Sequence, residues 1–135
     1  MALPNGAGGY QVGDGNLSEL TMGYAATPQT ATATATLTAA QVTGGMLVAN
    51  PSTSAATYTL PTAASIDAIV TSAKVGSTFD LNVINIGTSS GTVTLATATG
   101  ITDGGNAFVA VAITSSALFR FRKTGDATYT VYKVA

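Results

Sequence analysis

The acidic residues are the side chains of this protein best suited to acid–base chemistry. The chain has no histidine and no cysteine, and its six carboxylates are Asp14, Glu19, Asp67, Asp80, Asp103 and Asp126. Catalysis by carboxylates requires two of them close enough to separate their pKa values, and a catalytic serine normally requires a histidine base. The six are scattered along the chain, and none stands in the Asp-Thr-Gly setting of an aspartic protease. We therefore predict a protein that is not an enzyme and binds no cofactor.

Two short segments carry side-chain oxygens at a spacing that suggests a calcium loop. Residues 14–18 read Asp-Gly-Asn-Leu-Ser, with oxygen ligands at loop positions 1, 3 and 5. Glu19 then stands where such a loop requires glycine, and Ala25 stands where it requires a bidentate glutamate. Residues 103–106 offer two oxygens on a tight turn, which the turn preferences of Asp, Gly and Asn explain. We predict no metal site.

The densest group of charges is Arg120, Arg122 and Lys123. A two-residue turn at Gly125 and Asp126 would place Arg122 opposite Tyr129, Arg120 opposite Val131 and Phe119 opposite Tyr132. Phe119 and Phe121 would then face the core, and both guanidinium groups would project from the other face. Two interpretations remain open: a solvated face with Arg122 stacked on Tyr129, or a binding site in which Arg120 and Arg122 pair with carboxylates of a neighbouring subunit or another partner protein.

The chain contains too few charged residues to produce strong long-range electrostatic attraction of a partner. Only 8% of the residues are charged, against about 25% in an average domain, and the net charge is −1. Nucleic acid normally requires a basic surface, so we predict no nucleic-acid partner. The apolar runs, such as residues 107–113, are far shorter than the roughly 20 residues that span a bilayer, so we predict no membrane partner. A nearly uncharged surface suits a structural protein whose faces are covered by neighbouring subunits.

The first 28 residues are predicted to form an extended, glycine-rich N-terminal arm. Glycine is costly to order, and no helical or strand periodicity is present there. The segment is nevertheless more apolar than a plain linker, so it is either a terminus without contacts or an arm that orders against a partner. The candidate partner-binding residues of the arm are Leu3, Tyr10, Val12, Leu17, Leu20 and Tyr24. The first residues lack the basic start and long apolar stretch of a signal peptide, and the chain has no cysteine, so we expect synthesis and folding in a cytoplasm.

Residues 29–135 are predicted to form one all-β domain, a small antiparallel β-sandwich or jelly-roll-like barrel with one short helix. The helix covers about residues 63–73, where Thr62 provides the cap and apolar residues recur at helical spacing. Residues 46–49 and 57–60 are predicted to form a hairpin. The other predicted strands are residues 31–37, 78–84, 92–96, 107–113, 118–123 and 128–134. In the second of these, Phe79, Leu81 and Val83 alternate with polar residues, which is the pattern of a half-buried antiparallel strand.

Alternating Ala and Thr over residues 31–37 would place a row of threonines on one face of a strand. The row is formed by Thr30, Thr32, Thr34, Thr36 and Thr38. Regular threonine arrays can order water as ice-binding surfaces do, but this array is predicted to be only one strand deep, and the sequence has no internal repeat to extend it. We interpret it as a solvated edge or interface strand.

The order and spacing of several short motifs from residue 37 to the C-terminus resemble a β-domain of tailed-bacteriophage virion proteins. The motifs are Leu37-Thr38-Ala39-Ala40-Gln41, Leu60-Pro61-Thr62-Ala63-Ala64, Val75-Gly76-Ser77-Thr78-Phe79, Val83-Ile84-Asn85, Gly91-Thr92-Val93-Thr94-Leu95, Phe119-Arg120-Phe121-Arg122 and Tyr129-Thr130-Val131-Tyr132. Stand-alone copies with a glycine-rich arm resemble capsid decoration, or cement, proteins. The resemblance implies a homo-oligomer, expected to be a trimer, that is made in the bacterial cytoplasm and binds the major capsid protein on the outer capsid surface. A tail- or fibre-associated module that binds a receptor is the alternative.

Overall fold

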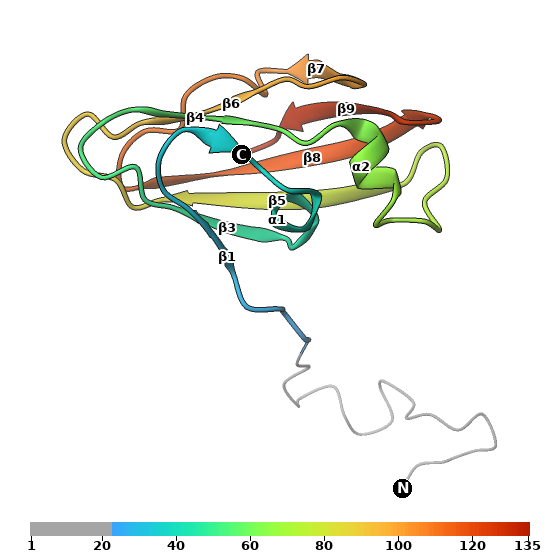
Figure 1. Cartoon of the computed structure of the whole chain (residues 1–135), viewed down its shortest axis with the longest axis horizontal. Coiled ribbons are helices and arrows are strands. Elements are labelled where there is room, and N and C mark those ends of the chain that lie inside the picture. Colours follow the sequence, from blue (N-terminus) through green and yellow to red (C-terminus); the bar gives the residue numbers. More distant parts are fainter. Residues whose placement is uncertain (1–22) are drawn as a thin grey trace, which may run out of the picture.

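The computed structural model describes residues 23–135, which form two β-sheets and two short helices (Figure 1). Strands make up 42% and helices 9% of this part, so the β-rich class predicted from the sequence is confirmed. Sheet A has six strands in the order β1 (Gln29–Ala31), β3 (Met46–Ala49), β5 (Thr78–Asn85), β8 (Ser115–Gly125), β9 (Thr128–Lys133) and β7 (Ile101–Gly105). Sheet B has three strands in the order β2 (Ala35–Thr36), β4 (Ala56–Thr59) and β6 (Val93–Ala96).

The strand pairing differs from the predicted antiparallel sandwich or jelly-roll-like barrel. β1, β3 and β5 are parallel to one another, as are all three strands of sheet B, and only β5–β8 and β8–β9 are antiparallel. The chain crosses three times from sheet A to sheet B, in the steps β1 to β2, β3 to β4 and β5 to β6. Each crossing runs in the same sense as the one before it. The strands that neighbour one another within each sheet, β1, β3 and β5 in sheet A and β2, β4 and β6 in sheet B, are therefore parallel. The architecture is a mixed sheet and a parallel sheet, and not clearly a sandwich or jelly roll.

Because the chain crosses repeatedly from one sheet to the other, two predictions from the sequence are wrong. Residues 46–49 and 57–60 do not form a hairpin, because β3 belongs to sheet A and β4 to sheet B. The Ala-Thr segment is not one strand, since Ala31 pairs with Ala49 in sheet A whereas Ala35 pairs with Tyr58 in sheet B. The Tyr58 hydroxyl donates to the Thr32 carbonyl at 2.6 Å and so holds the crossing between the two sheets.

The threonines that share a face therefore come from different strands, and the prediction of one continuous threonine row is wrong. On the outer face of sheet B, Thr36 pairs with Thr59, and Thr57 pairs with Thr94. Thr34 instead turns its hydroxyl to the backbone N–H of Thr57, at 3.0 Å. The array is three strands wide, although the sequence contains no repeat.

One hydrophobic core fills the space between the inner faces of the two sheets. Along β5, Leu81 and Val83 are fully buried, whereas Thr78 is exposed and Asp80 partly exposed, so the predicted alternation is confirmed. Phe119 and Phe121 on β8 are buried, as predicted, and Phe121 stacks on Phe79 with ring centroids 4.8 Å apart. The other large core residues are Tyr58, Leu60, Leu95, Leu47, Ile66, Val42, Val93, Val131 and Tyr129.

The protein has two helices in the described part rather than the predicted one. α2 (Ala63–Asp67) begins at the predicted cap, where Thr62 accepts from the N–H of Ser65, but it ends after five residues instead of continuing to residue 73. The chain continues as turns beyond Asp67, with the N–H of Val70 donating to the Ile66 carbonyl, and the Asp67 carboxylate at the end of α2 accepts from Lys123 and from the N–H of Ala127 in the β8–β9 hairpin. α1 (Ala39–Thr43) was missed, although a Thr38–Gln41 capping box starts it.

The seventh strand lies in a segment that was predicted to be a loop. β7 covers Ile101–Gly105, whereas residues 107–113, predicted to be a strand, form a loop that is joined to β6 by an isolated antiparallel bridge between Val111 and Val93. Gly104 permits this arrangement because a Cβ there would lie 2.4 Å from the Tyr132 ring and 2.5 Å from the Thr130 methyl group. These side chains of β9 therefore lie directly over the backbone of β7.

Three of the outermost strands, β1, β2 and β7, are short or interrupted, which protects their edges from pairing with another chain. β1 has three residues and β2 has two, and β7 is interrupted by a bulge between Asp103 and Gly105. Association through a sheet face is therefore favoured over edge-to-edge pairing. Within residues 23–135, no helix is long and apolar enough to cross a membrane.

Candidate interaction surface

The outer face of sheet A carries Arg120 and Arg122, in a different register from the predicted one. Arg122 lies opposite Thr130, Arg120 opposite Tyr132 and Phe119 opposite Lys133. The turn consists of Asp126 and Ala127, and a bulge between Lys123 and Gly125 shifts the pairing by one residue. Tyr129 consequently lies on the buried inner face, so the predicted stacking of Arg122 on Tyr129 is wrong.

Arg120 has an ion-pair partner within its own chain. Its Nε donates to Asp80 Oδ1 at 2.8 Å and its Nη2 to Asp80 Oδ2 at 2.9 Å, so the pair is bidentate across β5 and β8. These hydrogen bonds hold the pKa of Asp80 below, and that of Arg120 above, its ordinary value. Arg122 is exposed and has no ion-pair partner in residues 23–135. Of the two arginines, Arg122 is the one available to a partner's carboxylate.

An apolar area lies beside the arginines on the same face. We call it the apolar half; it consists of Met46, Val48, Ile84, Leu118, Ile86 and Val134. One cross-strand row consists of Met46, Asn82 and Leu118, and the next consists of Val48, Ile84 and Ser116, so the apolar side chains of β3, β5 and β8 lie in two adjacent rows with one polar residue in each. All six are at least partly exposed, and none belongs to the core cluster. The apolar half is therefore a second hydrophobic surface, separate from the core.

A polar cluster at the opposite end of the strands is structural. Asp67 accepts from Lys123 Nζ at 2.5 Å, from the Tyr129 hydroxyl at 2.6 Å and from the Ala127 N–H at 2.9 Å. The hydrogen bonds from Lys123 and Tyr129 lower the pKa of Asp67 to about 2, whereas burial and the Asp67 charge raise the pKa of Tyr129. Lys123 is nearly buried and its ammonium lies 5.2 Å from the Tyr129 ring centroid. Sequence reasoning missed the cluster because its members lie on α2, β8 and β9.

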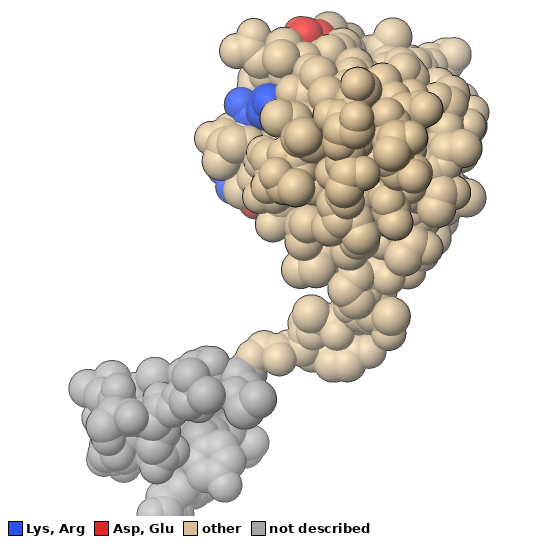
Figure 2. Space-filling view, turned by 90° about the vertical axis from the view of Figure 1, so that its left-hand side faces the viewer, with Lys and Arg blue, Asp and Glu red and all other residues tan. Residues whose placement is uncertain are grey.

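The other end of the molecule is nearly uncharged. The three connections there, residues 50–55, 86–92 and 106–114, contain no charged residue, and Figure 2 shows charged atoms only at the margins of this view. Asn85 is buried and ties the connections together. Its amide nitrogen lies 2.9–3.1 Å from the carbonyl oxygens of Gly91, Val111 and Ala112, and its oxygen accepts from Gly87.

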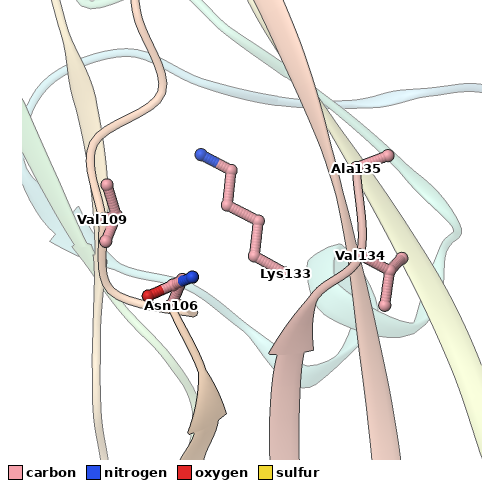
Figure 3. A pocket seen from close by; sticks show the side chains of 5 residues that line it. All are labelled: Asn106, Val109, Lys133, Val134 and Ala135. Carbon is pink, nitrogen blue, oxygen red and sulfur yellow. The ribbon is translucent and has the colours of Figure 1, made fainter.

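A hollow of about 450 Å³ lies next to this end, between the loop after β7 and the end of β9 (Figure 3). Figure 3 shows Lys133 extending between Val109 on one side and Val134 and Ala135 on the other, with Asn106 at its base. Lys133 has no ion-pair partner in the part of the chain that the structure describes. The surface around the hollow therefore presents the ammonium of Lys133 and two exposed valines, Val109 and Val134.

The remaining predicted site residues give a mixed result. Leu3, Tyr10, Val12, Leu17 and Leu20 lie outside the described residues, as does the calcium-like segment 14–18. Tyr24 is 95% exposed. Asp103 accepts through Oδ1 from the N–H groups of Gly105 and Ala107, as turn chemistry predicts. No group of three or more potential metal ligands occurs within residues 23–135.

We found no match to a protein-family model, to a curated protein or to a solved structure.

Proposed function

We propose that this protein is a structural protein of a tailed-phage virion, a head decoration protein that binds the outer capsid surface and stabilises the shell. The observation that carries the proposal is the outer face of sheet A, where an apolar half lies beside the free guanidinium of Arg122. Protein interfaces combine an apolar centre with arginine and few other charges. The resemblance of residues 37–135 to phage virion proteins supports the major capsid protein as the partner.

The proposed mechanism is linkage between binding and assembly. A protein that binds the assembled shell but not its free subunits stabilises the shell by an amount set by its concentration and affinity. Many copies on one particle multiply a modest contact. This role requires a rigid body with an adhesive face and no catalytic group, which is consistent with Asp67 and Asp80 being held in ion pairs within the chain.

Immunogold electron microscopy of particles from the source phage tests the proposal. Antibodies against the purified chain are expected to label the head, and a cryo-EM map of the same particles should show density of the chain on the outer capsid surface. Label on the tail or fibres would favour the receptor-binding alternative instead. Particles without label, from a preparation whose Western blot also lacks the chain, would refute a virion role.

Arg122→Gln tests the contribution of the free guanidinium to particle binding. We expect weaker binding to particles and a smaller dependence of the affinity on salt, because a charge pair at the interface is lost. The melting temperature should stay unchanged, since Arg122 has no ion pair to lose in the described part of its own chain. Lys74→Gln, which removes a cation outside sheet A, is the matched control and should bind as the native chain does. Equal affinity and salt dependence of both variants would exclude Arg122 from the contact.

A further inference from the structure

The apolar half of sheet A lacks a cover in the part of the chain that the structure describes. β1, β3, β5 and β8 bury their inner side chains in the core, whereas Met46, Val48, Ile84 and Leu118 face outward and are partly exposed. Val134 is 47% and Ile86 48% exposed at the border of this area. Contiguous exposed apolar side chains of this kind mark an interaction site.

The described chain begins next to this area. A groove of about 600 Å³ runs between residues 24–28 and residues 44–46, and Met46 belongs both to the groove and to the apolar half. Figure 1 shows residues 23–28 leading from β1 away from their own domain. Tyr24 is 95% exposed. Residues 23–28 therefore leave the domain rather than return over its own sheet.

The composition of residues 1–22 complements the outer face of sheet A. Its only charged side chains are the carboxylates of Asp14 and Glu19. The outer face presents the guanidinium of Arg122, which has no ion-pair partner within residues 23–135. Large apolar side chains flank the two carboxylates in the segment, namely Tyr10, Val12, Leu17, Leu20 and Met22. A segment that combines such side chains with carboxylates fits a face that combines an apolar half with an arginine.

We propose that residues 1–22 of one copy bind the apolar half of sheet A of a second copy, with Asp14 or Glu19 near Arg122. Twenty-two residues in extended form reach about 70 Å, which is enough to cross to an adjacent subunit. This exchange of N-terminal segments is the contact that holds the homo-oligomer together. The inference rests on the self-association included in the proposed function, but it does not depend on where the protein lies in a virion.

Disulfide trapping in the full-length chain tests this contact, because the native protein contains no cysteine. One chain carries Leu20→Cys, and a second, enlarged by a tag, carries Leu118→Cys. The two are mixed, oxidised and separated on a non-reducing gel. We expect a mixed disulfide between the two chains, formed on the order of tenfold faster than in the control mixture, because binding raises the local concentration of the thiols. The control replaces Leu118→Cys with Thr57→Cys on the outer face of sheet B.

The outcomes separate the possible occupants of the apolar half. Equal trapping at positions 118 and 57, repeated with Leu17→Cys to allow for a different register, would overturn the proposal. Closure within single chains of a Leu20→Cys, Leu118→Cys double variant, without mixed disulfides, would show that each arm covers its own sheet and would also overturn it. Thermal melts establish that each variant is folded. Particle labelling is independent of this assay, so the failure of one idea is distinguishable from the failure of the other.

Discussion

At the scale of single residues, Asp67 joins three elements through one carboxylate. It binds the Lys123 ammonium and the Tyr129 hydroxyl, both on the inner face of sheet A, and the N–H of Ala127 in the hairpin turn. Asp67→Asn should reduce the free energy of unfolding by about 3 kcal/mol, because the nearly buried ammonium loses its counter-charge. Urea unfolding measures this loss. Asp80→Asn, in the exposed pair with Arg120, is the control and should cost under about 1 kcal/mol. Similar losses in both variants would contradict a special role for Asp67.

The lowered pKa of Asp67 predicts how stability depends on pH. The pKa is about 2 in the folded protein and about 4 in an unfolded chain, so the folded state favours the ionised carboxylate. The stabilisation is fully present above about pH 4 and is lost as the pH falls through about 2. Urea midpoints measured from pH 6 to pH 2 should therefore decline more steeply for the native protein than for Asp67→Asn. Parallel curves would refute the assignment.

Asn85 makes an equally specific prediction at the uncharged end. Asn85→Ala removes the amide donor from the carbonyl oxygens of residues 91, 111 and 112, of which only that of Val111 keeps a second donor, the N–H of Val93, and it leaves the N–H of Gly87 without its acceptor. We expect the free energy of unfolding to fall by about 2–3 kcal/mol, since unsatisfied buried groups lose their full desolvation cost. Asn82→Ala, three residues earlier on the outer face, should change it by less than about 0.5 kcal/mol. Equal free energies of unfolding for the Asn85→Ala and Asn82→Ala variants would contradict this prediction and would show that water molecules replace the hydrogen bonds of the Asn85 amide.

At the scale of elements, β7 depends on the close approach of β9 to Gly104. Gly104→Ala places a Cβ within 2.4–2.5 Å of Tyr132 and Thr130, so one of the strands must move. Gly105→Ala is a matched control, because its Cβ would meet nothing nearer than 3.9 Å. We expect Gly104→Ala to destabilise the protein by about 1–3 kcal/mol and to speed amide hydrogen exchange in β7, with little change in the control. Identical exchange rates in the two variants would contradict the packing argument.

At the scale of the whole molecule, the apolar half should drive self-association. Light scattering of the native protein at micromolar concentration is expected to give an oligomer, for which the resemblance to decoration proteins implies a trimer. The oligomer should persist in 1 M salt, where the Debye length is about 3 Å, because apolar burial is not screened. Leu118→Glu should shift the mass to that of a monomer, whereas Thr57→Glu on the outer face of sheet B should not. An oligomer unaffected by Leu118→Glu would place the interface elsewhere.

The sequence by itself determined the features that depend on local chemistry. The alternation in residues 78–84 predicted β5 and its buried face, because side chains of a strand alternate whatever the strand pairs with. Thr62 predicted the start of α2, since a cap acts on the three residues that follow it. The low charge predicted an uncharged surface, which is a property of composition alone.

Only the tertiary structure decided the pairing, and with it the candidate interaction surface. Gln29 on β1 pairs with Leu47 on β3, and Leu47 pairs with Val83 on β5. The sequence separation of the second pair is twice that of the first, so no fixed repeat length in the sequence indicates which strands are neighbours. The turn lies one residue later than predicted, at Asp126 and Ala127, and together with the bulge at Thr124 it places Arg122 opposite Thr130 instead of Tyr129, because turn position and bulges fix every pair beyond them. Asp80 and Arg120 lie far apart in the chain and meet only because β5 and β8 are neighbours. Contacts between distant segments depend on how the whole chain closes its core, and no local pattern of residues encodes that.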